Sequence, residues 1–421
     1  MALTFEEKQR NYVQLLVEQG VNLQPEQQLQ INIEPGDIAL GELAAELAYR
    51  RGAKYVDLTL SSPRRDALQI AHAAPRHRNF IPGYVTVRSD QIVDTKGAIL
   101  SFRSSSEPDL FATLDQRHVA DFQAAAYEMR KRLATEGITA MGINWCLAGP
   151  PSRKWAQKVF PGVDPDEAVS KLWDDIFAMT FADQPDCLVR WRNHLDQLGR
   201  RAEKLSSLQI KELHFTGPGT DLVVGLSEKA TFVAGRKSTP AGIPFCPNVP
   251  TFEAYTTPDW RRTNGKARIT RPAIINGVKV IDLEVTFKEG EIVATSAAKN
   301  VDTYNALIAT DPGAKRLGEI ALVGIDSPIF RTGRVFESTL YDENAACHFA
   351  TGRAYEVGLI GGRQMSPTEL AEHGYNHSKT HQDVMISNEE VSVHAITYSG
   401  KEIPLLERGS WKPEFLDPRS P

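Results

Sequence analysis

Apolar and polar positions along the first half of the chain switch repeatedly between two periods. Residues 5–18 and 38–49 carry apolar side chains at helical spacing, and Gly52 ends the second of these segments. The segments 28–34 (QLQINIE) and 54–60 (KYVDLTL) instead alternate as half-buried strands do. Strands that alternate with helices predict βαβ units around a mostly parallel sheet.

The alternation continues towards the middle of the chain. The pattern over 119–136 predicts a long helix that ends at Gly137, and residues 140–149 (AMGINWCLAG) predict an apolar strand before a Gly-Pro-Pro turn. Two long helices follow, over 164–181 and 188–208. We interpret these two helices as a connector at the end of a first domain.

The second half of the chain is richer in Gly, Pro and Thr and contains shorter strand patterns, such as ELHFTG, DLVVGL and KVIDLEVTF. Residues 290–293 (GEIV) carry a hairpin signal. Residues 217–220 (GPGT) precede a strand and not a helix, so they indicate a tight turn and not a phosphate loop. These patterns predict an α+β domain with a bent, largely antiparallel sheet.

The length of the chain supports a division into two domains. Single hydrophobic cores stop growing near roughly 250–300 residues, and this chain has 421. We therefore expect an α/β N-terminal domain over 1–207 and a catalytic domain over 208–421. The first domain has no GxGxxG or GxxxxGK[ST] motif, so we expect it to shape the substrate site or to serve structure.

Composition and charge narrow the class of protein. Hydrophobic residues make up 41% of the chain, which is ordinary for a globular protein. The net charge is −5 and no long Lys/Arg run is present, so we expect no nucleic-acid partner. We see neither a signal-peptide pattern nor an apolar run of roughly 18 residues, and we expect a cytoplasmic protein without a membrane segment. Four widely spaced cysteines without a CxxC pair indicate reduced thiols.

Two segments of the second half join histidines with acidic residues. In an extended segment His381 and Asp383 would project from one face and converge on one ion, although a surface histidine beside an aspartate is the alternative. His348 and Tyr355 are seven residues apart and would share a face if residues 341–355 formed a helix. The alternative for that segment is a core helix with a buried, hydrogen-bonded histidine. Glu343 lies near the start of the same segment.

Two further carboxylates stand out in the second half. Glu319 interrupts an apolar run, where an unpaired buried carboxylate costs several kcal/mol unless it is paired or bound to a metal. Glu253 lies on a segment with Pro250 and Pro258 as rigid ends, which suits a ligand.

Together these side chains predict a dinuclear metal site. Mixed nitrogen and oxygen donors suit Zn, Co or Mn, and six donors exceed the needs of one catalytic ion. Two ions about 3.5–4 Å apart, sharing a carboxylate and a water, would use them all. The candidate ligands are Glu253, Glu319, Glu343, His348, His381 and Asp383.

The other histidines of the second half are weaker candidates. The spacing of His373, His377 and His381 mimics a helical stripe, but Gly374 argues against a regular helix there. We expect His373 and His377 to lie behind the ligands or in solvent. His214 and His394 lie on predicted strands and are expected to serve structure.

Five segments of the second half resemble the aminopeptidase T and aminopeptidase S family of dinuclear metallopeptidases, in the same order and with similar separations. They are TGPGTDLVVGL, NVPTFEAYTTPDW, RLGEIALV, DENAACHFATGRAY and NHSKTHQDVMI. The resemblance implies two divalent ions (Zn, Co, Mn or Mg), peptide substrates, and a homodimer with an enclosed active site.

The resemblance also implies roles for individual residues. Glu253 matches the first carboxylate ligand, and Glu319 matches the carboxylate that bridges the metals. His348, His381 and Asp383 match the remaining ligands, Glu343 matches an acid sometimes treated as a ligand, and Tyr355 matches a tyrosine near the metals. The family commonly has two consecutive acids after Pro-Thr, whereas Phe252 replaces the first of them here.

The expected activity is that of a metal-dependent aminopeptidase that releases N-terminal amino acids with a water activated by two metals. Glu319 and Tyr355 are the expected catalytic residues, as proton carrier and oxyanion donor. The alternatives are another dinuclear metallohydrolase, such as a phosphoesterase, and a non-catalytic protein that binds amino acids or metal.

Overall fold

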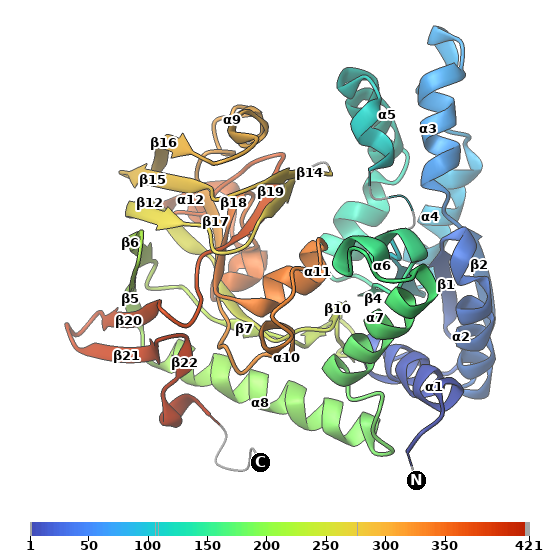
Figure 1. The fold of residues 1–421 in the computed structure, drawn as a ribbon, viewed down its shortest axis with the longest axis horizontal. Helices are drawn as coiled ribbons and strands as arrows, with labels where there is room; N and C mark the ends of the chain where they lie inside the picture. The colour runs from blue at the N-terminus through green and yellow to red at the C-terminus, as the bar shows by residue number, and fades with distance from the viewer. Residues whose placement is uncertain (1, 106, 108, 276, 417–421) are drawn as a thin grey trace. The chain divides into compact units, whose positions relative to one another are not determined.

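The computed structural model describes residues 2–105, 107, 109–275 and 277–416. The chain divides into two compact units (Figure 1), one of Met1–Asn193 with Arg236–Pro250 and one of His194–Gly235 with Thr251–Pro421. The division falls within helix α8 (Cys187–Ser207). The boundary at 207/208 stays a prediction about domains that fold independently.

The first unit is built on a parallel sheet, as the sequence predicts. In the described part of the chain its strand order is β10-β4-β3-β1-β2, and every neighbouring pair is parallel. The strands are β1 (Gln28–Ile33), β2 (Tyr55–Leu60), β3 (Ala98–Phe102), β4 (Asn144–Ala148) and β10 (Asn248–Val249), and a short hairpin joins β8 (Lys237–Ser238) to β9 (Pro244–Phe245).

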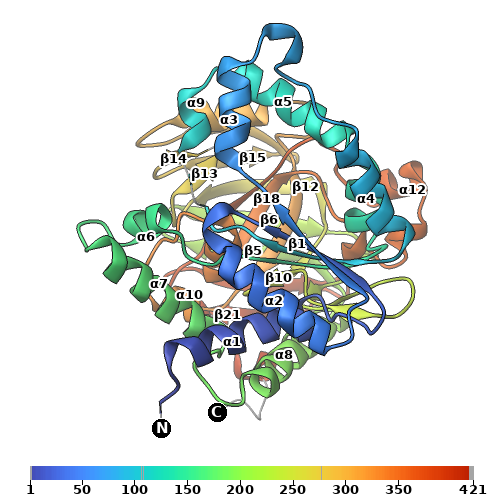
Figure 2. The same cartoon turned by 90° about the vertical axis from the view of Figure 1, so that its right-hand side faces the viewer.

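The helices of this unit are α1 (Phe5–Leu15), α2 (Ile38–Arg50), α3 (Pro63–His72), α4 (Tyr84–Asp94), α5 (Gln116–Glu128), α6 (Arg153–Val159) and α7 (Pro165–Met179). Helices α2 and α4 pack on opposite faces of the sheet. Helix α2 packs on β1 and β2 and lies at the front of Figure 2. Ile92 and Val93 of α4 pack on Ile99 of β3, in a cluster that Trp145 of β4 also joins. Strand β3 in the middle of the sheet is buried at four of its five positions, whereas the edge strand β2 is buried only at Val56.

The helix predicted over 119–136 is shorter in the structure. Helix α5 ends at Glu128, and a wider helical turn follows over Leu133–Thr139. The hydroxyl of Thr135 donates to the carbonyl of Lys131 at 2.9 Å, and the backbone N–H of Ala140 reaches back five residues to Thr135. The interruption itself lies at Met129 and Arg130, where the hydroxyl of Thr86 donates to the carbonyl of Met129 at 3.0 Å. A side chain that bonds to a carbonyl of a helix interrupts its hydrogen-bond ladder.

The second unit contains two larger antiparallel sheets, which confirms the predicted fold class. Within the described residues one sheet has the order β19-β18-β17-β11-β7 and the other β16-β15-β12-β6-β5-β20-β21-β22. The first consists of β7 (Val233–Ala234), β11 (Ala254–Thr256), β17 (Leu317–Leu322), β18 (His348–Gly352) and β19 (His381–Met385). The second consists of β5 (Ile210–Gly217), β6 (Thr220–Leu226), β12 (Pro258–Arg268), β15 (Glu284–Lys288), β16 (Glu291–Ser296), β20 (Ser392–Thr397), β21 (Glu402–Glu407) and β22 (Ser410–Trp411).

The smaller elements of this unit are the strand pair β13 (Ala273–Ile275) and β14 (Val278–Val280), and the helices α9 (Val301–Ile308), α10 (Pro328–Arg331), α11 (Thr339–Asp342) and α12 (Pro367–Glu372). Strand β12 of the larger sheet contacts β17 of the smaller one (Figure 1). The register of β12 against β6 shifts between Pro258 and Thr263, and such a shift bends a sheet.

The predicted turns are present in this unit. Pro218 and Gly219 connect β5 to β6, and Glu289 and Gly290 connect β15 to β16. Gly219 and Gly290 both have positive φ angles, of 78° and 85°, which glycine adopts without a steric penalty. The segment KVIDLEVTF forms two strands and not one, because Asp282 has a φ of 53° and interrupts the extended backbone.

The four cysteines are buried and free. Among the described residues, none of the helices is both long and apolar enough to cross a lipid bilayer.

Candidate metal centre

One face of the smaller antiparallel sheet carries most of the candidate residues. Glu319 of β17 and Asp383 of β19 are both paired with Ala350 of β18. His348 precedes Ala350 by two residues, and His381 precedes Asp383 by two. Paired residues and residues two apart point to the same face of an antiparallel sheet, so Glu319, His348, His381 and Asp383 share a face.

The opposite face of this sheet packs against the larger sheet. There the ring of Phe349 meets that of Phe287 edge to face, with 5.5 Å between centroids. Glu253 lies directly before β11, two residues from Tyr255, which is paired with Ala321 on the face of the candidate residues. One face of the sheet is therefore packed in the apolar core, and the other face carries the cluster of acidic residues and histidines.

The segment around His348 is not a helix, which is the condition under which His348 and Tyr355 would share a face. Residues 348–352 form strand β18, which is paired on both sides by β17 and β19. Only residues 339–345 contain short helical turns. His348 and Tyr355 therefore do not share a helical face, and Tyr355 lies after the end of the strand.

Donor atoms of five predicted ligands lie close together. His348 Nε2 is 3.1 Å from Glu253 Oε2 and 3.7 Å from Glu319 Oε1. His381 Nε2 is 3.6 Å from Glu319 Oε2 and 3.5 Å from Asp383 Oδ1. Two sets of three residues each place their donor atoms within 4.8 Å of one another. One set is Glu253, Glu319 and His348, and the other is Glu319, His381 and Asp383.

Hydrogen bonds behind the two imidazoles fix their orientation. His348 Nδ1 donates to the carbonyl of Ala346 at 3.1 Å, and His381 Nδ1 donates to the carbonyl of Arg353 at 2.7 Å. A carbonyl only accepts, so each Nδ1 carries a hydrogen and each Nε2 faces the carboxylates. Metal-binding histidines are commonly oriented in this way.

The remaining two predicted residues lie at the edge of this cluster. Among the described residues neither three-donor set includes Glu343, but its burial and the charges of Asp383 and Glu253 hold the pKa of Glu343 well above its usual range. The ring centroid of Tyr355 is 4.9 Å from that of His381. Burial and the nearby Glu319 raise the pKa of the Tyr355 phenol, which therefore keeps its proton.

The charges within the cluster are strongly coupled. Burial lowers the pKa of His381, but Asp383 and Glu319 outweigh burial and raise that pKa to about 9. Burial likewise opposes the charged form of His348, and Glu253 and Glu319 hold its pKa well above the usual value. Burial raises the pKa of Glu319, and the hydrogen bond from His348 opposes this. Cationic imidazoles thus balance part of the negative charge.

The donor set fits divalent metal ions. Glu253 Oε2 is buried and accepts no well-aligned hydrogen bond from the described residues, although His348 Nε2 is near. Four carboxylates, those of Glu253, Glu319, Glu343 and Asp383, share this small region with only two imidazoles, and bound cations would neutralise the remaining negative charge. Imidazole nitrogens with carboxylate oxygens suit Zn, Co or Mn.

Phe252, the departure from the family pattern, has a packing role. Its side chain is buried, and its ring lies 4.6 Å from the ring of His194. His194 Nε2 also donates to the carbonyl of Thr251 at 2.8 Å. Burial lowers the pKa of His194 to about 4, so this histidine is neutral and outside the metal set.

The weaker histidine candidates lie elsewhere. His373 is 3.0 Å from the hydroxyl of Ser227, and His377 packs on the ring of Tyr375. His214 of β5 and His394 of β20 are paired across the larger sheet. The structure therefore brings neither pair into the cluster.

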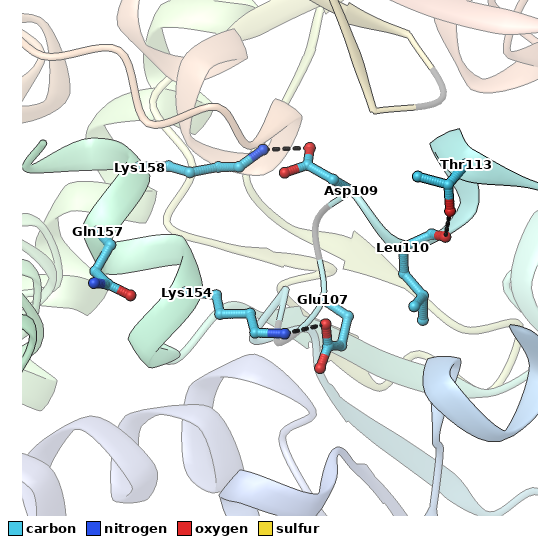
Figure 3. Close-up of a pocket in the computed structure, with 7 residues that line it drawn as sticks. All are labelled: Glu107, Asp109, Leu110, Thr113, Lys154, Gln157 and Lys158. Carbon is cyan, nitrogen blue, oxygen red and sulfur yellow. Dashed lines mark hydrogen bonds and ion pairs between the residues drawn. The ribbon is translucent and has the colours of Figure 1, made fainter.

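A cavity of about 420 Å³ in the first unit does not change this assignment (Figure 3). Lys154 and Lys158 of α6 line it, and each forms an ion pair across the cavity, with Glu107 and Asp109 respectively. Its charges are therefore already paired.

Gly318 permits a close approach that the site depends on. A Cβ at this position would lie 2.4 Å from the carbonyl oxygens of Gly352 and Arg353, and the latter oxygen orients His381. We expect Gly318→Ala to lower stability by about 1–3 kcal/mol and to weaken metal binding. Urea unfolding and metal titration of the variant check this.

Gly199→Ala is the control: Gly199 lies in α8 with nothing within 4 Å of its Cβ position, so its unfolding free energy should not fall and metal binding should be unchanged. Wild-type stability in Gly318→Ala would contradict the prediction.

Comparisons with known proteins show which family the chain resembles. Residues 5–411 match the model of the thermophilic metalloprotease family, M29. Aminopeptidase T of Thermus thermophilus is 35% identical over 407 residues, covering 97% of this chain and 99% of that protein. Aminopeptidase 2 of Geobacillus stearothermophilus is 34% identical over 407 residues, covering 97% and 98%.

A solved structure extends the likeness to the whole fold. Wild-type AmpT from Thermus thermophilus aligns with a TM-score of 0.90 and 34% identity, over 97% of this chain and 100% of that one. The chain therefore belongs to the thermophilic metalloprotease family M29 and is a metal-dependent aminopeptidase.

Proposed function

We propose that this aminopeptidase uses two divalent metal ions, with Glu319 as the carboxylate that both share. One ion would be held by Glu253, Glu319 and His348, and the other by Glu319, His381 and Asp383. The observation that carries the proposal is the position of Glu319, whose Oε1 is 3.7 Å from His348 Nε2 and whose Oε2 is 3.6 Å from His381 Nε2. Each oxygen of one carboxylate thus belongs to a different donor set.

The chemistry of the donors supports Zn, Co, Mn or Mg as the bound ions. Imidazole nitrogen favours the first three, and the carboxylate-rich set accommodates the fourth. Glu343 is proposed as an additional ligand or as a proton carrier, because it is buried beside the two sets and its pKa is raised.

When bound, the ions would supply an activated water and a Lewis acid for the scissile carbonyl. Side chains of the protein would stabilise the oxyanion and transfer the protons. Tyr355 keeps its proton and would donate a hydrogen bond to the oxyanion that develops on the carbonyl oxygen. Glu343, which belongs to neither set of three among the described residues, would accept the proton of the water and pass it to the leaving amine.

The excess of carboxylates also suits the substrate of an aminopeptidase. A free α-amine is cationic in solution and would be attracted by Glu343 and its neighbours. The burial of the cluster favours a chain end over an internal peptide segment. We therefore propose peptides with a free N-terminus as substrates.

We also propose that the enzyme acts in the cytoplasm as a homodimer. Four buried free cysteines are typical of proteins from reducing compartments.

The proposal of a dimer rests on the resemblance of the five sequence motifs. Light scattering should give twice the mass of one chain, and a monomer across the working concentration range would reject the dimer.

Metal removal tests the proposed function directly. Protein stripped by a chelator should lose the release of N-terminal residues from a peptide library, because no activated water remains. Adding Zn, Co, Mn or Mg back separately should restore activity, with two ions bound per chain. A phosphate ester assayed in parallel covers the phosphoesterase alternative. Full activity in metal-free protein, or restoration at one ion per chain, would reject the two-metal proposal.

A further inference from the structure

Asn344 occupies a central position behind the candidate metal centre. It is 1% exposed and lies in the turn after α11, directly after Glu343. Its Oδ1 accepts a hydrogen bond of 2.6 Å from the backbone N–H of Phe252, a residue 92 positions earlier. Its Nδ2 donates to the carbonyl of Leu340 at 3.0 Å and lies 3.5 Å from Glu343 Oε1. One amide therefore contacts both acid-bearing segments.

The backbone of Asn344 is itself anchored. The hydroxyl of Ser327, which is 3% exposed, donates to the carbonyl of Asn344 at 2.6 Å. The bond from Asn344 Nδ2 to Leu340 closes the turn on its own helix. The side-chain amide therefore has little freedom to follow a movement of Phe252.

The segment that Asn344 contacts carries Glu253 and has no strand partner of its own. Residues 251–253 precede β11 as irregular backbone. His194 holds the carbonyl of Thr251 on one side, and Asn344 holds the N–H of Phe252 on the other. Glu253 follows immediately, and its Oε2 is the buried oxygen beside His348. The direction of the Glu253 side chain thus depends on these two hydrogen bonds.

We propose that Asn344 is a positioning residue that sets the place of Glu253 relative to Glu343, and thereby tunes metal binding. The inference rests on the proposed function. Without the acceptor the buried N–H of Phe252 is left unpaired, which is costly. The segment 251–253 would then shift towards water, and Glu253 would leave its donor set.

Cobalt titration of chelator-stripped protein tests this proposal. In Asn344→Ala we expect Co²⁺ affinity to fall by about 10- to 100-fold, the range found when partners of metal ligands are removed. We also expect a changed d–d absorption spectrum, because the geometry of the donors changes. Asn344→Asp keeps the acceptor for the Phe252 N–H, so its d–d spectrum should stay closer to that of the wild type than the spectrum of Asn344→Ala does. If Asn344→Ala does not fold, Asn344→Ser replaces it, because the serine side chain is too short for its hydroxyl to reach the N–H of Phe252.

A matched control separates positioning from general stability. Asn144 is fully buried in the first unit and donates to the carbonyl of Val21 at 2.6 Å and to Gln27 at 3.2 Å. Asn144→Ala should lower the melting temperature without changing Co²⁺ affinity or the spectrum.

The outcomes distinguish the two proposals. Wild-type protein that binds no Co²⁺ would reject the proposed function. Wild-type protein that binds Co²⁺, together with unchanged affinity and spectrum in Asn344→Ala, would overturn the role of Asn344 alone. Equal spectral changes in Asn344→Asp and Asn344→Ala would also overturn it, because the retained acceptor would then have no effect on the geometry of the donors.

Discussion

Replacing Glu319 with alanine is expected to reduce kcat/KM for an aminoacyl-nitroanilide by at least about 1,000-fold, because the water activated between two ions is lost. Both donor sets contain this carboxylate, so bound metal should fall below two ions per chain. Steady-state kinetics and elemental analysis of the dialysed protein measure the two effects. Among the described residues, Glu319 is the one residue that the two sets share.

Glu319→Gln refines the same prediction. Burial and neighbouring carboxylates raise the pKa of Glu319, so its ionised form costs stability in the metal-free fold at neutral pH, and the cost is relieved as the pH falls. Glutamine keeps the shape without the charge. Metal-free Glu319→Gln should therefore melt above the metal-free wild type, whereas in excess metal the order should reverse.

The control for both variants is Glu402→Ala. Glu402 pairs with His394 at 2.8 Å on the larger sheet, where it is exposed. This variant should keep wild-type kinetics and metal content. Two ions per chain and full activity in Glu319→Ala would reject the shared carboxylate.

Parts of the site follow from local pattern. His381 and Asp383 were predicted to share a face because an extended segment alternates, and β19 is extended. Glu319 was conspicuous because a carboxylate within an apolar strand needs a partner, and β17 is buried along its whole length. In both cases the signal is contained within a few residues. The roles of these side chains as ligands stay predictions.

The segment around His348 shows where local pattern misleads. Alanines at 345, 346, 350 and 354 favour a helix, but Phe349 belongs to the core between the two sheets. Pairing with β17 and β19 on both sides outweighs the intrinsic preference. The small side chain at Ala350 instead leaves room between Glu319 and Asp383.

The supports of the site could not be predicted from the sequence. Asn344 acts on Phe252 across 92 residues, and His194 acts on Thr251 across 57. Neither contact is visible in the periodicity or composition of the sequence. A hydrogen bond from a side chain to the backbone can form with a partner residue of almost any type.

Tyr355→Phe should separate catalysis from metal binding. We expect kcat to fall by about 100- to 1,000-fold, the usual effect of removing one donor to a developing oxyanion. Metal content should stay at the wild-type level, because Tyr355 contributes to neither donor set among the described residues. KM should change little, since the hydrogen bond strengthens mainly in the transition state. Kinetics on an aminoacyl-nitroanilide and metal analysis of the same sample measure these quantities.

The physical basis is the protonation state of the phenol. Burial and the charge of Glu319 raise the pKa of Tyr355, so it remains a donor throughout the pH range of a folded protein. Tyr398→Phe is the matched control: its hydroxyl donates at 2.7 Å to the carbonyl of Leu226, which lies in β6 of the larger sheet. Losing that bond should cost about 1 kcal/mol of stability and leave kcat unchanged. A loss of metal in Tyr355→Phe would indicate that the tyrosine is a metal ligand. An unchanged kcat would reject its role as a hydrogen-bond donor to the oxyanion.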